Sequence, residues 1–149
     1  MKFQIPPSLK SEHEELHAEL VKAIQVGGKI GEAAQSVAEV LHPHFVKEEE
    51  YALPPLGLLG LLSEGKVLPE MKNVFSMTDK LKRELPQMLE EHKAIVGKLK
   101  GLVEAAKKEG RMEFAHFAEK LALHAKTEEE VLYPASILIG DYLKLSGWC

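Results

Sequence analysis

Apolar residues recur at steps of three and four along most of this 149-residue chain, which is the period of amphipathic helices. The strict alternation that marks strands is almost absent. Glycine and proline separate four periodic stretches. In chain order, the inward positions of these stretches are Leu9, His13, Leu16, Leu20, Ala23 and Ile24; Ile30, Ala34, Val37, Leu41, His44, Glu48 and Tyr51; Leu85, Met88, His92, Ile95, Leu99, Leu102 and Ala106; and Phe114, Phe117, Leu121, His124, Glu128 and Leu132. The pattern predicts an all-α fold with four main helices.

The first two helices are bounded by proline and glycine. The first is expected to begin near Ser8 or Ser11, because Ser11 has the spacing of a capping box with the glutamate three residues later. The glycines within residues 27–31 mark its end. The second helix follows at once and is expected to end at Pro54–Pro55. Pro43 lies inside it and is expected to kink it by removing one backbone hydrogen bond.

A longer connection comes next, and the helical pattern resumes near Pro69. Pro86 interrupts the pattern, either as a kink or as the first turn of a new helix. Gly110 precedes the fourth helix, which is expected to end at Pro134, and residues 135–146 can form one more short helix. Helices joined by short links are antiparallel neighbours. The prediction is therefore an antiparallel up-down-up-down four-helix bundle, with a longer crossover between the second and third helices and a short C-terminal helix.

Composition and charge narrow the class of protein. A chain that is 45% hydrophobic and 28% charged suits one globular domain, residues 1–149. A formal net charge of -4 argues against a nucleic-acid partner. No apolar run approaches the roughly 20 residues that span a bilayer, and the N-terminus lacks the apolar core of a signal peptide. We therefore expect no membrane partner and a cytoplasmic location.

The second half of the chain repeats the polar positions of the first. Residues 44–54 and 124–134 are identical at five of eleven positions, and a Glu-His pair occurs at 12–13 and again at 91–92. At roughly 1.5 Å per residue, all four histidines of the repeat lie roughly 20–27 Å from the short turns. Residues four apart share a helix face. Six polar side chains on the inward stripes are thus expected at one level of the bundle: His13, His44, Glu48, His92, His124 and Glu128.

Six polar groups in one layer of an apolar core need compensation. Each unpaired group would cost about 1–3 kcal/mol, and a buried charge more. Metal coordination can supply that compensation, because neutral imidazole and carboxylate are good ligands. The alternative is a fully satisfied network of hydrogen bonds between histidine and glutamate without a metal.

The number and type of candidate ligands bear on the metal. Four imidazoles and two carboxylates are too many for one tetrahedral zinc, and the sequence has no thiolate cluster for an iron–sulfur site. Six ligands suit two ions if each glutamate bridges both, with open coordination positions left over. The residual positive charge favours a bridging oxo or hydroxo ligand. We expect two iron ions as the cofactor, with manganese or another divalent metal as the alternative.

These motifs resemble those of the hemerythrin-like family, also called the HHE cation-binding domain. The resemblance extends over nearly the whole chain, to Pro134. It implies a di-iron site bridged by two glutamates, with O₂, peroxide or nitric oxide as the exogenous ligand. The residues that carry it are His13 after Glu12, His44 with Glu48, His92 after Glu91, and His124 with Glu128.

The histidine pattern departs from that of one branch of the family. Oxygen-carrying hemerythrins of invertebrates have five histidines, with a His-x-x-x-His pair on the third helix. Val96 stands here where the second histidine of that pair would be. His17, four residues after His13, makes a similar pair on the first helix, either as a fifth imidazole ligand or as a residue beside the ligands. The departure weighs against reversible oxygen carriage.

Other polar residues near the motifs have simpler expected positions. Glu49 and Glu129 extend acidic runs that are expected to face solvent, or to replace the preceding glutamate as ligands if it points elsewhere. His42 and His116 lie off the inward stripes and are expected at the surface or on a flank.

The expected function is the binding or sensing of O₂ or nitric oxide, or the buffering of iron. The expected partner is a small diatomic ligand or peroxide. Tyr51 and Tyr133 are expected to be core or rim aromatics, or to donate a hydrogen bond to a bound oxygen species. Two alternatives remain open: a di-iron enzyme that acts on nitric oxide or peroxide, and a structural bundle that metal stabilises.

Overall fold

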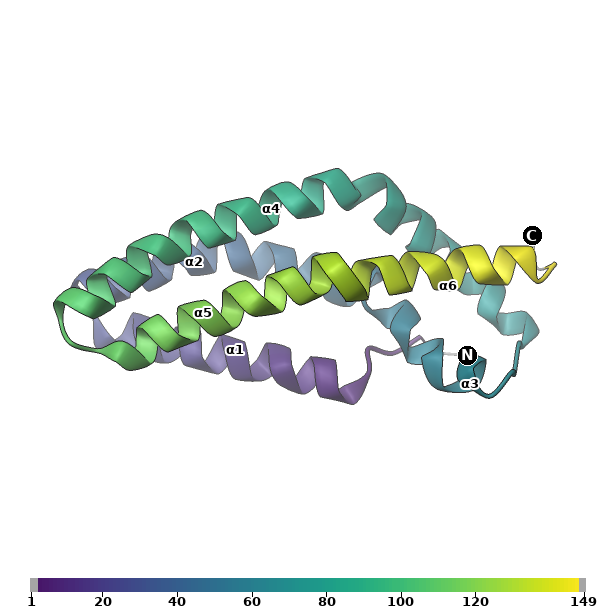
Figure 1. Ribbon diagram of the computed structural model, residues 1–149, viewed down its shortest axis with the longest axis horizontal. Coiled ribbons are helices and arrows are strands. Elements are labelled where there is room, and N and C mark those ends of the chain that lie inside the picture. Colours follow the sequence, from purple (N-terminus) through teal and green to yellow (C-terminus); the bar gives the residue numbers. More distant parts are fainter. Residues whose placement is uncertain (1–2, 148–149) are drawn as a thin grey trace.

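A computed structural model describes residues 3–147, and this part of the chain is helical with no strand (Figure 1). Short turns join the long helices in antiparallel pairs, and the predicted all-α bundle is confirmed. Within this part of the chain, no helix combines the length and the apolar character that crossing a membrane requires. The long helices are α1 (Pro7–Val26), α2 (Gly28–Lys47), α4 (Phe75–Lys108) and α5 (Met112–Thr127).

The inward stripes form one apolar core between the four helices. Large side chains from each helix are buried there, which is where apolar burial contributes most to folding. The turns at one end of this core are tight, and Gly27 and Gly110 adopt positive φ angles of 75° and 68° that other residues rarely adopt. Members of the core include Leu16, Leu20, Ile30, Val37, Ile95, Leu99, Leu102, Phe117 and Leu121.

The predicted capping box does not form. Helix α1 begins at Pro7, so Ser11 lies inside the helix, and no side chain caps the first turn. Proline suits this first position because the N–H that it lacks would have no partner in the helix anyway. Proline at the helix start therefore overrides the serine signal.

The crossover between α2 and α4 is longer, as predicted, but it is mostly helical. It comprises the π-helical turn η1 (Glu48–Ala52), the 3₁₀ turn η2 (Pro54–Leu58), the short helix α3 (Leu59–Ser63) and the 3₁₀ turn η3 (Pro69–Val74). Its apolar side chains pack with the C-terminal helix in a second cluster outside the main core. Pro86 lies within α4, so it starts no new helix.

The prediction that Pro134 ends the fourth helix is wrong. A π-helical turn, η4 (Glu128–Leu132), follows α5, and α6 (Tyr133–Leu145) then continues along the same line (Figure 1). Pro134 occupies the first turn of α6, where its missing N–H does no harm. The expected short C-terminal helix exists, and it extends the bundle beyond the N-terminus of α1.

Candidate metal centre

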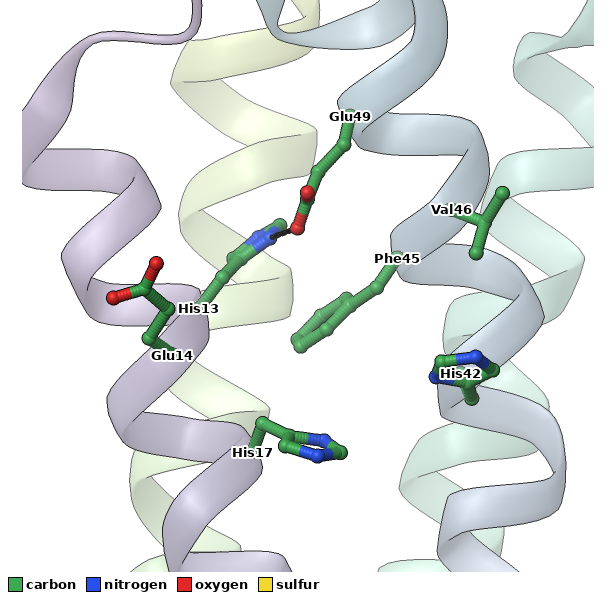
Figure 2. Close-up of a pocket in the computed structure, with 7 residues that line it drawn as sticks. All are labelled: His13, Glu14, His17, His42, Phe45, Val46 and Glu49. Atoms are coloured by element: carbon green, nitrogen blue, oxygen red, sulfur yellow. Dashed lines mark hydrogen bonds and ion pairs between the residues drawn. The ribbon is translucent and has the colours of Figure 1, made fainter.

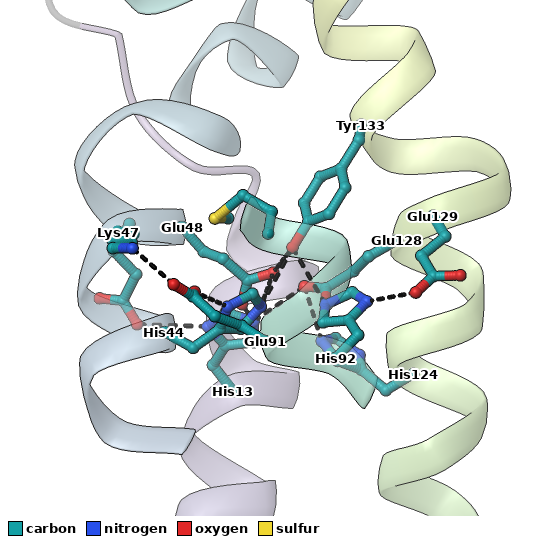
Figure 3. A network of polar contacts seen from close by, with 12 residues as sticks. His13, His44, Lys47, Glu48, Glu91, His92, His124, Glu128, Glu129 and Tyr133 are labelled. Carbon is teal, nitrogen blue, oxygen red and sulfur yellow. Dashed lines mark hydrogen bonds and ion pairs between the residues drawn. The ribbon is translucent and has the colours of Figure 1, made fainter. Parts of the chain in front are cut away.

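Six of the predicted residues meet in one cluster (Figure 3). Their positions in the helices place the cluster at the end of the main bundle opposite the short turns. One histidine comes from each long helix, and one glutamate opens each of the turns η1 and η4. All six side chains are buried, with exposed fractions of 5% or less. They are His13, His44, Glu48, His92, His124 and Glu128.

Four of these residues face one another on one side of the centre. His44, Glu48, His92 and Glu128, here called the His44 group, place ligand atoms within 4.8 Å of one another. His44 Nε2 lies 3.3 Å from Glu48 Oε2, and His92 Nε2 lies 3.2 Å from Glu128 Oε1.

The other side is formed by His13, His124 and Glu128, here called the His13 group. Glu128 Oε2 lies 3.1 Å from His124 Nε2 and 3.6 Å from His13 Nε2. Glu48 Oε1 lies 3.5 Å from His13 Nε2. Each carboxylate therefore directs one oxygen toward each side.

Each of the four imidazoles also contacts a carboxylate outside the six residues. In each case the Nδ1 edge meets a glutamate from another helix, which in the neutral imidazole favours the proton on Nδ1 and leaves Nε2 free to bind a cation. The N–O distances are 3.3, 2.7 and 2.9 Å for the first three pairs. The pairs are His13 with Glu49, His44 with Glu91, His92 with Glu129, and His124 with Glu12.

The sequence analysis did not predict the role of these four glutamates, here called the outer glutamates. Glu49 and Glu129 are 41% and 38% exposed, as a solvated face requires, yet each also holds a histidine. Glu12 and Glu91 were visible only as parts of the repeated Glu-His pair. That repeat is the signal that could have found them. In each pair the histidine joins the centre, and the glutamate contacts a histidine on another helix.

The two π-helical turns were also missed. Glu48 and Glu128 begin them, and the backbone oxygen of each accepts a hydrogen bond from the residue five positions later, Leu53 or Tyr133. Turns of this kind are rare and occur often at functional sites. Their sequence signal is the proline that follows each turn.

The pKa values of two histidines are raised, which indicates that the centre favours positive charge. Burial alone would lower the pKa of His44, but the carboxylates of Glu48 and Glu91 outweigh it and raise that pKa to about 9. The pKa of His124 also rises to about 9, because Glu128 outweighs the effect of burial.

The two central carboxyl groups differ. Burial and the neighbouring carboxylate of Glu128 raise the pKa of Glu48 to about 7. Burial acts in the same direction on Glu128, but hydrogen bonds from Glu48 and His124 hold its pKa well below the usual range. One of the pair is thus ionised far more readily than the other.

Unsatisfied atoms in the centre fit a cation. His13 Nε2 and Glu48 Oε1 are buried without a hydrogen-bond partner and face each other across 3.5 Å. Leaving such atoms unpaired costs about 1–3 kcal/mol each. A metal ion between them would bind both, and nitrogen and oxygen donors suit iron, manganese or zinc. The residues present therefore fit a metal.

Tyr133 enters the centre from the first turn of α6. Its side chain is fully buried, and its hydroxyl donates a hydrogen bond of 2.5 Å to Glu48 Oε2. Burial and the carboxylates of Glu48 and Glu128 raise the pKa of Tyr133, so the phenol is protonated in the absence of a cation. Tyr51 is buried in the same side-chain cluster as Tyr133, but its hydroxyl donates to the sulfur of Met88.

A surface pocket of about 290 Å³ lies against the outer face of His13 (Figure 2). Phe45 forms its inner wall and stacks on the His13 ring, with centroids 4.0 Å apart and planes 5° from parallel. His17 and His42 line the pocket with ring centroids 6.5 Å apart, and both are exposed. His17 is in neither ligand group. The expected surface position of His42 is confirmed, as is that of His116.

Fold and centre together define a metal-binding helical bundle. The family described as the hemerythrin HHE cation-binding domain matches residues 5–136, and the chain belongs to that family. Comparison with curated proteins and with solved structures gives no match.

Proposed function

We propose that the protein holds two iron ions and uses them to bind or sense O₂ or nitric oxide, or to buffer iron. The observation that carries the proposal is the direction of the two carboxylates. Glu48 and Glu128 each present one oxygen to the His44 group and the other to the His13 group. Two carboxylates placed in this way suit a pair of ions and would be redundant around one.

The charge and the ligand types support iron. Two divalent ions carry a charge of +4, and the two central carboxylates offset half of it. Four imidazoles add neutral donors, which leaves coordination positions for a small ligand. When bound, the ions supply Lewis-acidic and redox-active positions. Manganese in place of iron is the closest alternative for such a donor set.

The chain itself orients the donors and keeps water away. The four outer glutamates fix the ring orientations, so Nε2 of every histidine points inward. Phe45 covers His13 from the solvent side, and the six ligand side chains are almost fully buried. Such a dry site favours binding of a small uncharged ligand such as O₂ or nitric oxide.

Iron content and ligand response test the proposal. The full chain, loaded anaerobically with ferrous iron, should retain two iron ions per chain after desalting. Glu128→Gln should retain fewer, whereas Glu130→Gln should retain two, because Glu130 is exposed and lies outside both groups. Equal iron content in both variants would contradict the proposal.

The spectrum of the ferrous protein separates the possible roles. Binding or sensing predicts a stable optical change with O₂ or nitric oxide at one ligand per site. Continuous consumption of nitric oxide or peroxide would indicate an enzyme instead. No response to any of these ligands would leave buffering of iron or a structural role.

A further inference from the structure

The hydroxyl of Tyr133 lies among the donor atoms of the His44 group (Figure 3). Its oxygen is 3.2 Å from His44 Nε2 and 3.2 Å from His92 Nε2. It is also 2.5 Å from Glu48 Oε2. The phenol oxygen therefore approaches three of the four ligand atoms on that side.

The two distances of 3.2 Å to the histidines match the spacing of neighbouring ligands on one ion, whereas the 2.5 Å contact with Glu48 is a hydrogen bond. Donors about 2.1 Å from a metal and at right angles to each other lie about 3 Å apart. The imidazole and carboxylate atoms of the His44 group already have that spacing, at 3.2 and 3.3 Å. The phenol oxygen has a similar spacing to both histidines. The ring of Tyr133 stacks on the ring of His92, with centroids 5.6 Å apart.

The internal repeat shows that this oxygen has no counterpart on the other side. Tyr133 follows Glu128 by five residues, and the residue five after Glu48 is Leu53. Leu53 is buried in the apolar cluster of the crossover and offers no donor atom. The two halves of the centre are alike in histidine and glutamate, but they differ at this position.

We propose that Tyr133 is an oxygen ligand of the ion on the His44 side, so that an exogenous ligand binds to the other ion, on the His13 side. The inference rests on the two-ion function proposed above. Coordination replaces the phenolic O–H bond with a bond from oxygen to the metal. The proton leaves to solvent, and no electron is transferred.

Phenolate bound to ferric iron gives a visible charge-transfer band, and resonance Raman excitation in that band shows vibrations of the tyrosine ring. The full chain loaded with ferric iron should show both signals, and deuteration of the tyrosine rings should shift the vibrations. Tyr133→Phe should lose the band. Tyr51→Phe should keep it, because Tyr51 contacts Met88 and lies outside both groups.

A second variant tests the same assignment if Tyr133→Phe does not fold. The chain has three tyrosines, so the double variant Tyr51→Phe/Tyr142→Phe keeps Tyr133 alone. The band should persist in that variant. Two bound iron ions without a phenolate band would overturn the role of Tyr133 and leave the proposed function intact. Fewer than two bound iron ions would count against the proposed function itself.

Azide tests the second half of the inference, because this small anion binds to open positions on ferric iron. Azide should add its own absorption and leave the phenolate vibrations unchanged, since it would occupy the ion that lacks Tyr133. Loss of the phenolate vibrations on addition of azide would place the exogenous ligand at the position of Tyr133 and overturn the inference.

Discussion

Each histidine of the candidate centre is held by a glutamate from a different helix, so its orientation depends on side chains outside the six that could bind a metal. Glu91 shows this best, because it accepts hydrogen bonds from His44, Lys47 and Gln87 at 2.7, 2.5 and 3.2 Å. Supports of this kind set both the tautomer and the basicity of a ligand imidazole.

Removal of Glu91 should therefore weaken metal binding. We expect Glu91→Ala to lower the affinity for ferrous iron about 10- to 100-fold, because His44 loses the acceptor that fixes its ring. Titration against a competing chelator measures the change. Glu90→Ala is the matched control, since Glu90 is 66% exposed and pairs among the described contacts only with Lys93, which is 75% exposed. Equal affinity in the two variants would show that the outer glutamates do not support the ligands.

The protonation of the centre makes a second prediction, for the metal-free protein. The pKa values of His44 and His124 rise from 6.5 to about 9 on folding. Protons held by the folded state stabilise it, so this contribution is complete below pH 6.5 and is lost as the pH rises through about 9. Burial raises the pKa of Glu48 as well, which acts in the same direction.

Urea unfolding of the chelated protein should therefore show stability falling between pH 6.5 and 9. Each proton bound only by the folded state contributes about 1.4 kcal/mol per pH unit to that slope. Affinity for metal should rise over the same range, because ions compete with protons for the imidazoles. A chelated protein whose stability rises from pH 6.5 to 9 would contradict the assigned shifts.

At the scale of elements, the position of α6 decides where Tyr133 enters the centre. Helix α6 crosses α4 closely at Gly140, where an added Cβ would lie 2.2 Å from Thr78 Oγ1 and 2.7 Å from Thr78 Cβ. Only a residue without a side chain fits that crossing. The close approach anchors the helix that begins with Tyr133.

Gly140→Ala should accordingly destabilise the protein by about 1–3 kcal/mol, the usual cost of excess volume in a packed site. Gly101→Ala in α4 is the control, because nothing lies within 4 Å of its added Cβ and its backbone is helical. That change should stabilise by about 0.5–1 kcal/mol. Thermal unfolding of both variants measures the difference, and equal stabilities would show that the α4–α6 crossing tolerates a methyl group.

The elements also show which features a periodic pattern can predict. A helix of constant pitch predicts the inward stripes and the positions of the four histidines along the bundle axis. The positions of glycine and proline predict the crossover. The continuation past Pro134 does not, because a π-helical turn changes the pitch for one turn and relieves the clash that proline would otherwise cause. A pattern that assumes 3.6 residues per turn cannot show such a turn.

The contacts of the outer glutamates could not be predicted for a different reason. Glu12 and Glu91 each precede a histidine of the candidate centre, so they point about 100° away from it around the same helix. Their partners, His124 and His44, lie on other helices. The pattern along one helix reports which face is buried, but it does not report which side chain on a neighbouring helix meets a residue at the edge of that face.

At the scale of the molecule, the centre ties together four helices that short turns join only in pairs. A metal that binds the folded state alone stabilises it by about 2.7 kcal/mol when its free concentration is 100 times Kd. For a chain of 149 residues this corresponds to a rise in Tm of roughly 5–10 °C. Scanning calorimetry with and without chelator measures that rise, and an unchanged Tm would mean that the bundle needs no metal.

The central claim is that Glu48 and Glu128 bridge two ions. Anomalous scattering at the iron absorption edge, measured on crystals of the iron-loaded full chain, tests it most directly. The account predicts two peaks, one beside His44 and His92 and one beside His13 and His124, with a carboxylate oxygen of each glutamate at each peak. A single peak, or none between these side chains, would contradict it.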